Sequence, residues 1–344
     1  MKKLYFLFTL IFFNFYNSQT TPSFHDTQGN IEVNGGGQLQ YTLPIALPPG
    51  IKSVAPQMNL VYTSGSGNGI AGYGWNFSGI TSISRMGKTI EKDGEVANVK
   101  LNYSDFYSFN GQRLFYKSGG NGPPYGGADG SVYTTEKYSN IIVKARGGVT
   151  GQSWQGPEYW EVTFEDGSQA WYGATTTGAS NARTPVEYNI VKWKDAQGNY
   201  IAYNYTQANN VAVISSVQWG GNETLGKAHF NSITFNYITR DLKETSYVNG
   251  VQFLQDKLLS NVVVNANGSQ FKKYVVNYSK PTVDNNPNKI VNYQFVASIQ
   301  EFNSQNEEAN PVTFATKSLT TNTQERPFGD FENIITSGDY NGDG

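Results

Sequence analysis

Apolar and polar residues alternate along much of this 344-residue chain, which is the pattern of half-buried β-strands. Met58, Leu60 and Tyr62, for example, fall on one face of an extended segment, because side chains alternate between the two faces of a strand. A further strand is predicted over residues 38–44, and Pro48-Pro49-Gly50 between the two segments forces a turn. The N-terminal part of the fold is therefore predicted to be β-structure.

From residue 100 onward one unit recurs: an apolar strand, a tight polar turn and a Tyr-rich strand. Asn-Gly and Asp-Gly pairs adopt positive φ at little cost, so they are the strongest short signals of a hairpin. Such turns are predicted at Asn110-Gly111, Asp166-Gly167, residues 195–199 (DAQGN) and Asn267-Gly268. The spacing between units varies, so a solenoid with a fixed repeat is not indicated.

Two segments depart from this pattern. Residues 242–261 are the least strand-like part of the chain, and the Gly/Pro-rich residues 119–130 are predicted to form a loop. Helix signals are weak throughout. The sequence thus predicts an all-β fold of antiparallel hairpins that buries Trp75, Trp160 and Trp193.

Composition narrows the class of protein. Gly (37 residues), Tyr (23) and Phe (20) are abundant, whereas charged residues make up 15% of the chain against an average of about 25%. This balance is typical of an extracellular all-β protein. The formal net charge of −2 provides no basic surface for nucleic acid. Because the chain has no cysteine, disulfides, thiolate metal sites and a cysteine nucleophile are excluded.

The N-terminus has the features of a secretory signal. Lys2 and Lys3 precede the apolar residues 4–13, a run too short to span a bilayer. We predict a signal peptide over residues 1–18 and a secreted, extracellular protein, with a buried N-terminal helix as the alternative. No later stretch is long and apolar enough for a transmembrane helix, so no transmembrane segment is expected after signal cleavage.

Residues 35–85 hold the most specific pattern in the chain, with strands, a Pro-Pro-Gly turn, a Gly/Ser/Asn loop and a Gly-Tyr-Gly-Trp corner in close succession. This order resembles the N-terminal domain of the SpvB family, which the B component of Tc insecticidal toxins shares. Residues 109–114 (FNGQRL) and 195–205 also resemble recurring segments of such domains, and the second resembles the repeats of Rhs shells. The matching elements of the first stretch are residues 41–44 (YTLP), Pro48-Pro49-Gly50, Pro56, and residues 60–62 (LVY), 64–69 (SGSGNG), 72–75 (GYGW) and 83–85 (ISR).

The resemblance implies a function as well as a fold. In that family this region contributes to a β shell or scaffold for toxin assembly and delivery, and any toxic enzyme lies far C-terminal. We therefore expect a non-enzymatic chain without catalytic residues. The implied partners are other toxin-complex components or downstream shell domains of the same chain. A cell-surface adhesin or glycan-binding β protein is the alternative, and a hydrolase is a third, weaker hypothesis.

The C-terminal residues 337–344 (SGDYNGDG) differ from the rest of the chain. Asp339, Asn341 and Asp343 stand at alternate positions before Gly344, which is the opening of an EF-hand-like calcium loop. The segment resembles the start of an FG-GAP or VCBS repeat, a calcium-bearing turn of β-propeller blades. An Asx-rich turn without metal is the alternative.

Calcium takes about six to eight oxygen ligands, and this motif supplies three side chains. We therefore expect Ca²⁺ in a longer protein, and weak or no binding, hence no bound cofactor, in this chain. The expected organisation is a signal peptide (1–18), an SpvB-like β domain (19–322) and the start of a propeller repeat (323–344), which a longer protein would complete.

The remaining polar clusters favour structural roles. His25 and His229 lie in no motif with metal-ligand spacing. Strand alternation places Glu161 and Glu165 on the face opposite Trp160, as expected for a solvated surface rather than a glycosidase pair. The full acidic cluster is Glu158, Glu161, Glu165 and Asp166.

The glycine-rich residues 64–69 lack the lysine and the following helix of a phosphate-binding loop. We predict instead a structural loop that lays Tyr73 and Trp75 onto the sheet, with the glycines leaving room for close backbone approach. The competing interpretation is a partner-binding loop that exposes Trp75 as an anchor.

Overall fold

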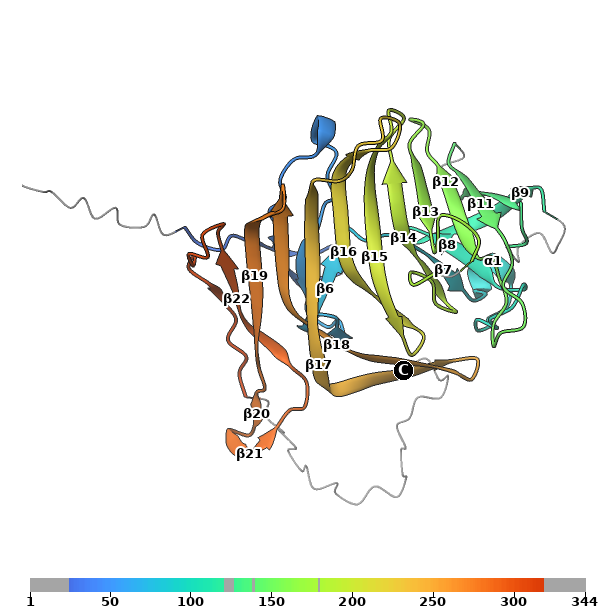
Figure 1. The fold of residues 1–344 in the computed structure, drawn as a ribbon. Helices are drawn as coiled ribbons and strands as arrows, with labels where there is room; N and C mark the ends of the chain where they lie inside the picture. Colours follow the sequence, from blue (N-terminus) through green and yellow to red (C-terminus); the bar gives the residue numbers. More distant parts are fainter. Residues whose placement is uncertain (1–24, 121–126, 138–139, 179, 319–344) are drawn as a thin grey trace, which may run out of the picture.

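The computed structural model describes residues 25–120, 127–137, 140–178 and 180–318 (Figure 1). Within these ranges strands dominate, and the helical content is one 3₁₀ turn, η1 (Ile51–Ser53), and one α-helical turn, α1 (Ile90–Asp93). The strands are β1 (Asn30–Val33), β2 (Leu39–Pro44), β3 (Asn59–Thr63), β4 (Asn68–Gly69), β5 (Gly72–Tyr73), β6 (Trp75–Ser78), β7 (Ser82–Met86), β8 (Phe106–Phe109), β9 (Gln112–Ser118), β10 (Val132–Thr135), β11 (Ile142–Arg146), β12 (Tyr159–Thr163), β13 (Gln169–Tyr172), β14 (Glu187–Lys194), β15 (Asn199–Ala208), β16 (Val211–Asn222), β17 (Asn231–Val248), β18 (Val251–Ala266), β19 (Ser269–Ser279), β20 (Thr282–Val283), β21 (Asn286–Ile290), β22 (Phe295–Phe302) and β23 (Val312–Thr313).

Two sheets carry the fold, and the predicted all-β, antiparallel class is confirmed. A four-stranded sheet has the order β1-β2-β3-β6. A larger sheet has the order β13-β12-β11-β10-β9-β8-β7-β14-β15-β16-β17-β18-β19-β22-β23. Because β13 also pairs with β14, strands β7 to β14 close into a ring of eight, and the remaining strands extend from the ring as an open curved sheet (Figure 1).

The hairpins form at the turns that the sequence predicts. Asn110 and Gly111 have φ of 49° and 74° between β8 and β9, and Asn267 and Gly268 have φ of 50° and 80° between β18 and β19. Two successive positive φ values match the right-handed twist of the strands that they join. Gly167 has φ of 80° between β12 and β13.

The prediction for residues 242–261 was wrong in one respect. This segment forms the outer halves of β17 and β18, which turn at Asn249-Gly250. Its alternation was hidden because this half of the hairpin is mostly exposed and because the register shifts between Thr239 and Glu244. Figure 1 shows the two strands bending across the lower side of the molecule.

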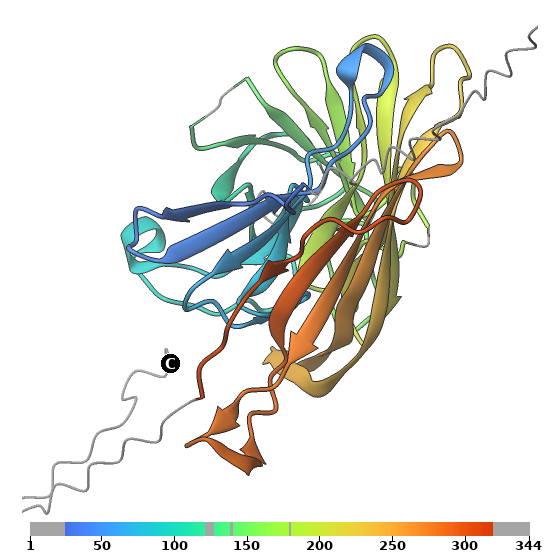
Figure 2. The same ribbon diagram turned by 90° about the vertical axis from the view of Figure 1, so that its left-hand side faces the viewer.

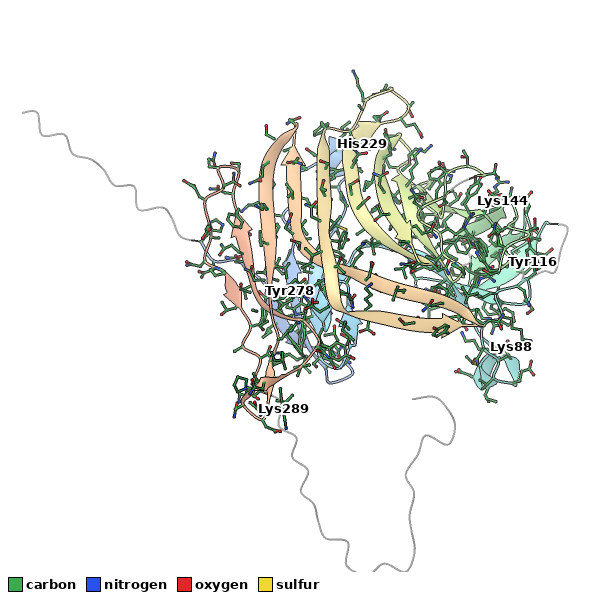
Figure 3. The ribbon with its side chains drawn as sticks, turned by 60° about the horizontal axis from the view of Figure 1, so that its bottom comes forward. Lys88, Tyr116, Lys144, His229, Tyr278 and Lys289 are labelled. Atoms are coloured by element: carbon green, nitrogen blue, oxygen red, sulfur yellow. The ribbon has the colours of Figure 1, made fainter. Side chains whose placement is uncertain are left out.

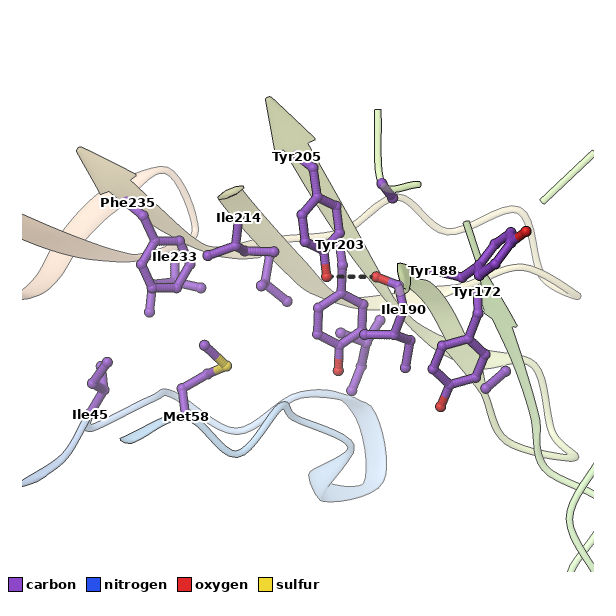
Figure 4. Packing of buried hydrophobic residues seen from close by; sticks show 14 of the residues in the cluster. Ile45, Met58, Tyr172, Tyr188, Ile190, Tyr203, Tyr205, Ile214, Ile233 and Phe235 are labelled. Atoms are coloured by element: carbon purple, nitrogen blue, oxygen red, sulfur yellow. Dashed lines mark hydrogen bonds between the residues drawn. The ribbon is translucent and has the colours of Figure 1, made fainter. Parts of the chain in front are cut away.

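The main core lies between the two sheets, which lie side by side in Figure 2. Leu43 and Leu60 of the small sheet are buried. Met58, which directly precedes β3, is buried as well, as are Ile214 and Ile233 of the large sheet (Figure 4). Met58 and Leu60 lie on one face, as predicted, and their side chains form part of this apolar layer. The Pro-Pro-Gly turn also contacts the large sheet, in that Trp219 Nε1 donates to Pro48 O at 2.9 Å and Asn231 Nδ2 donates to Pro49 O at 3.1 Å.

A second, aromatic core fills the ring. Trp160 is fully buried and makes edge-on contacts with Tyr107, Tyr133 and Tyr188 at centroid distances of 4.8, 5.6 and 6.0 Å. Burial raises the pKa of Tyr188 to about 12, so its hydroxyl stays neutral. These contacts make the ring a packed body rather than a channel.

The burial of two predicted tryptophans is confirmed and that of the third is not. Trp75 and Trp160 are 3% and 0% exposed. Trp193, in contrast, lies near the end of β14 and is only partly buried. No helix in the described ranges has the length and apolar character needed to cross a membrane.

Candidate functional site

The glycine-rich loop predicted at residues 64–69 and the corner that follows it form a junction between distant strands. Asn68 Nδ2 donates to Glu244 Oε1 at 2.8 Å, and the Gly69 carbonyl accepts from Arg240 Nη2 at 2.6 Å. Farther along, the Tyr73 amide donates to Gln294 O at 2.9 Å. The loop thus connects the small sheet to the bend of the β17–β18 hairpin and to the start of β22.

Glycine is required at two positions of this junction. Gly72 and Gly74 have φ of +102° and +82°, which L-residues rarely adopt. A Cβ at Gly72 would lie 2.8 Å from Gln294 O, and a Cβ at Gly74 would lie 2.4 Å from the ring of Tyr62. The prediction that these glycines permit close approach is confirmed.

Trp75 is the apolar centre of the junction. Its ring contacts those of Tyr41, Tyr62 and Phe314 at 5.9, 5.6 and 5.0 Å, and it is 3% exposed. The interpretation of Trp75 as an exposed partner anchor is therefore wrong, because Phe314, beyond β23, covers the ring from the other end of the chain.

Arg240 fixes the bend of the long hairpin beneath this loop. The residue is 2% exposed, and its Nε donates to Lys257 O at 3.0 Å. Burial lowers its pKa, and nearby Glu244 and Asp256 oppose that change. Tyr278, labelled in Figure 3, donates from its hydroxyl to Leu259 O at 2.6 Å on the adjacent strand. Arg240 and Tyr278 thus bind backbone carbonyls of β18 near the bend.

A buried ion pair closes one end of the ring. Arg85, the last residue of the ISR motif, donates from Nη1 to Asp105 Oδ2 at 2.8 Å. Although burial alone lowers the pKa of Arg85, nearby Tyr107, Tyr188 and Asp105 raise it above its ordinary value. The guanidinium also lies over the Tyr107 ring, 5.2 Å from its centroid. Its other acceptors are the carbonyls of Asn102, Gln155 and Pro185.

Asn102 and Asp105 belong to one loop, and Gln155 and Pro185 belong to two others, so the Arg85 side chain holds three segments together. Asp105 in turn accepts from the backbone amides of Lys100 at 2.7 Å and Asn102 at 3.2 Å. Apart from the ion pair itself, these bonds satisfy backbone groups of loops.

The predicted calcium residues Asp339, Asn341 and Asp343 and the predicted signal peptide lie outside the described residues, so both stay predictions. Within the described ranges, no group of three or more His, Cys, Asp or Glu side chains could hold a metal ion.

The acidic cluster of β12 is dispersed among structural contacts. Glu161 accepts from Arg146 Nε at 2.7 Å, Glu158 accepts from the Gly178 amide at 2.6 Å, and Asp166 accepts from Ser168 within its own turn. The predicted alternation is confirmed for Glu161, which is partly exposed, beside fully buried Trp160.

The two histidines have separate environments. His25 Nε2 lies 3.1 Å from Glu301 Oε1, a carboxylate that also pairs with Lys272. His229 Nδ1 accepts from the Gly221 amide at 3.2 Å.

Sequence reasoning missed the distant partners of these motifs. Arg240, Gln294 and Phe314 contact the glycine loop or Trp75 from more than 170 residues away in sequence, and Asp105 has no local motif. The one available signal was Arg85 itself, a charge within an apolar strand, which requires a buried partner.

A comparison with protein-family models identifies the family of this chain. A family model described as SpvB, Salmonella virulence plasmid 65kDa B protein, matches residues 33–289. The chain belongs to the SpvB family. The matched range contains the glycine loop, Trp75 and the Arg85–Asp105 pair. A search of curated protein sequences finds no match.

Solved structures share the fold of this SpvB-family chain. The crystal structure of TcdB2-TccC3 is similar with a TM-score of 0.58 and 15% identity, over 84% of this chain and 16% of that one. The Tc holotoxin pore of Photorhabdus luminescens, with the TccC3-D651A mutation, has a TM-score of 0.55 and 15% identity, over 85% of this chain and 16% of that one. The N-terminal domain of effector protein SpvB from Salmonella typhimurium strain LT2 has a TM-score of 0.53 and 16% identity, over 76% of this chain and 98% of that one.

Proposed function

We propose that this chain is a non-enzymatic β domain of a secreted SpvB/Tc-B-like toxin component, where it forms part of a shell or scaffold for toxin assembly and delivery. One observation carries the proposal. Most of this chain has the fold of a segment that makes up only 16% of the TcdB2-TccC3 chain. Such a segment is a part of a larger assembly, so its partners are downstream shell domains or other toxin components.

The packing supports a scaffold role. A wall element must hold its shape, and ring closure between β13 and β14 removes the free edges that eight separate strands would leave. The buried Arg85–Asp105 pair and the aromatic cluster around Trp160 fix the interior of that ring. The guanidinium groups of Arg85 and Arg240 both donate to backbone carbonyls, which supports a structural role for these two buried charges.

Secretion and calcium belong to the same proposal. The residues 1–18 would direct export, and Asp339, Asn341 and Asp343 would supply three ligands of a calcium turn in the adjoining propeller. Residues 1–18 and the calcium segment both lie outside the described residues, and each part of the proposal is tested by its own experiment.

The decisive experiment expresses the complete protein in its native host and locates it by fractionation, followed by electron microscopy of the purified particles. We expect the protein in the culture medium and a hollow β shell with this domain in its wall. Retention on the cell surface without a shell would contradict the proposal and favour the adhesin alternative. Turnover of glycan or peptide substrates by the purified 19–344 chain would contradict the non-enzymatic part alone.

A further inference from the structure

The ring of β7 to β14 has two different ends. Arg85 pairs across the strands with Tyr107 at one end, and Ile83 pairs with Phe109 toward the other. Beyond Phe109, whose ring centroid is 6.3 Å from that of Phe164, the packed interior gives way to a cavity of about 480 Å³. We call this the end cavity. It is lined by Lys137, Asn140, Ile141, Phe164, Glu165, Asp166, Ser168 and Trp193.

The hollow follows from the residue sizes on three adjacent strands. Phe164 follows β12 and Trp193 lies in β14, and both turn toward the interior. Between them lie Ser168, which directly precedes β13, and Ala170 of β13, and both are small and buried. Two large aromatic rings separated by small side chains leave a gap that cannot close, because the backbone spacing of the sheet is fixed. This gap explains why Trp193 is only partly buried.

The chemistry of the lining is divided between wall and rim. Phe164, Trp193 and Ile141 supply apolar wall, whereas Glu165, Asp166 and Lys137 bring charged groups to the rim. Asp166 Oδ1 accepts from the amide and hydroxyl of Ser168 at 2.9 and 2.6 Å, which fixes the carboxylate in its turn. These two bonds hold the pKa of Asp166 below its usual value, so the carboxylate is ionised at neutral pH.

Two of these charged groups are available to a ligand. Among the described residues, Asp166 Oδ2 has no hydrogen-bond partner and Lys137 Nζ makes no ion pair. Glu165 accepts one long bond, from Asn140 Nδ2 at 3.4 Å. The rim therefore offers hydrogen-bond acceptors and one donor around an aromatic wall.

We propose that the end cavity binds a short neutral oligosaccharide. A pyranose has an apolar C–H face that packs on the negatively polarised face of an aromatic ring such as Trp193. Its hydroxyl groups are donors to carboxylates and acceptors from an ammonium, as the rim requires. The volume lies within the range of about 300–1,000 Å³ for small-molecule sites, many of which occupy the open end of a closed sheet.

The charge of the rim decides against other ligands of similar size. Two carboxylates against one ammonium repel phosphates, sulfated sugars and sialylated sugars. A purely apolar ligand would offer no hydrogen-bond donor to the carboxylates of Glu165 and Asp166 at the rim. The site is independent of the shell proposal, because a wall domain and an adhesin could both present it at a surface.

The test measures saccharide binding by the purified 19–344 chain on an array of neutral, sulfated and sialylated oligosaccharides, followed by calorimetry with the best neutral ligand. We expect saturable binding to a neutral oligosaccharide. Trp193→Ala should weaken it by roughly tenfold or more, which corresponds to about 1.4 kcal/mol or more. Glu165→Ala should also weaken saccharide binding. Because Glu165 is exposed, this variant is expected to fold, and it tests the site even if Trp193→Ala disrupts the fold.

Trp171→Ala is the matched control. Trp171 lies on β13, next to β14, but on the outer face, where Lys192 and Lys194 lie 5.0 and 5.3 Å from its ring. Its removal should leave saccharide affinity unchanged. The proposal is overturned if no neutral oligosaccharide binds, if only anionic glycans bind, or if binding survives both Trp193→Ala and Glu165→Ala.

Discussion

Arg85 and Asp105 form an ion pair of 2.8 Å in which the side chains are 0% and 3% exposed. A pair so deeply buried gains little over an apolar replacement, yet the loss of one partner leaves an uncompensated charge. Since Arg85 also binds three loop carbonyls, the pair determines whether one end of the ring is ordered.

Asp105→Asn should therefore lower the free energy of unfolding by about 3–5 kcal/mol, as measured by urea denaturation. The matched control is Glu95→Gln, which removes the carboxylate of the exposed Lys88–Glu95 pair and should change stability little. Equal effects of the two substitutions would contradict the structural role of Arg85–Asp105.

Trp75→Ala should destabilise the domain by about 3–5 kcal/mol, because it empties a pocket enclosed by Tyr41, Tyr62 and Phe314. Thermal unfolding checks this expectation. Tyr247→Ala, at a residue that is 66% exposed, is the control and should stay within about 0.5 kcal/mol of the wild type. An unchanged melting temperature for Trp75→Ala would refute the structural reading of the loop.

Two glycines of the same loop should respond differently to alanine. Gly72→Ala forces an L-residue to φ of +102° and brings its Cβ against Gln294 O, so a cost of at least about 1–3 kcal/mol is expected. A Cβ at Gly67 meets nothing within 4 Å, and its φ is not in the left-handed region. Gly67→Ala should be neutral or slightly stabilising in the same denaturation series. Similar losses for both would contradict the assignment of the cost at Gly72 to close approach and positive φ.

Acid should weaken the fold near His229, which lies at one end of the large sheet (Figure 3). Burial lowers the pKa of His229, helped by Lys192 and opposed by a backbone hydrogen bond. Its ring centroid is 4.1 Å from that of Tyr200, and Nδ1 must be unprotonated to accept from the Gly221 amide.

The unfolded chain therefore binds more protons at this residue than the folded chain once the pH falls below about 6.5. The stabilisation is complete above that pH and is lost progressively as the pH falls through the lower folded-state pKa. Melting temperatures at pH 7.5 and 5.5 should show a smaller acid-induced decrease for His229→Gln than for the wild type, with His25 and all other groups common to both proteins. An identical decrease in the two proteins would contradict this assignment.

Calcium should distinguish this chain from a longer one. Calorimetry is expected to show weak or no binding to the 344-residue chain, and tight binding to a protein extended through the predicted propeller repeat. Asp339→Ala and Asp343→Ala should abolish the tight binding, since each removes a carboxylate ligand. Calcium binding by the extended protein that survives both substitutions would place the site elsewhere.

The sequence by itself determined the local features of this protein. Asn110-Gly111 and Asn267-Gly268 specify hairpin turns because positive φ is a property of those residues, and the alternation of Met58 and Leu60 specifies a buried face. The glycines around Trp75 could be assigned a packing role for the same reason, since the lack of a Cβ matters wherever backbones approach closely. The motifs of residues 35–85 were also sufficient to indicate the family.

Only the tertiary structure decided which distant groups meet. The closure of β13 onto β14, the contact of Arg240 with Gly69 and the cover of Trp75 by Phe314 join segments whose separation along the chain leaves no periodic signal. The partial exposure of Trp193 depends on small residues on a neighbouring strand. The hairpin of residues 242–261 could not be predicted because its mostly exposed faces lack a clear alternation of apolar and polar residues. Local conformation depends on each residue and its neighbours, whereas burial and pairing depend on the sheet register that the whole chain adopts.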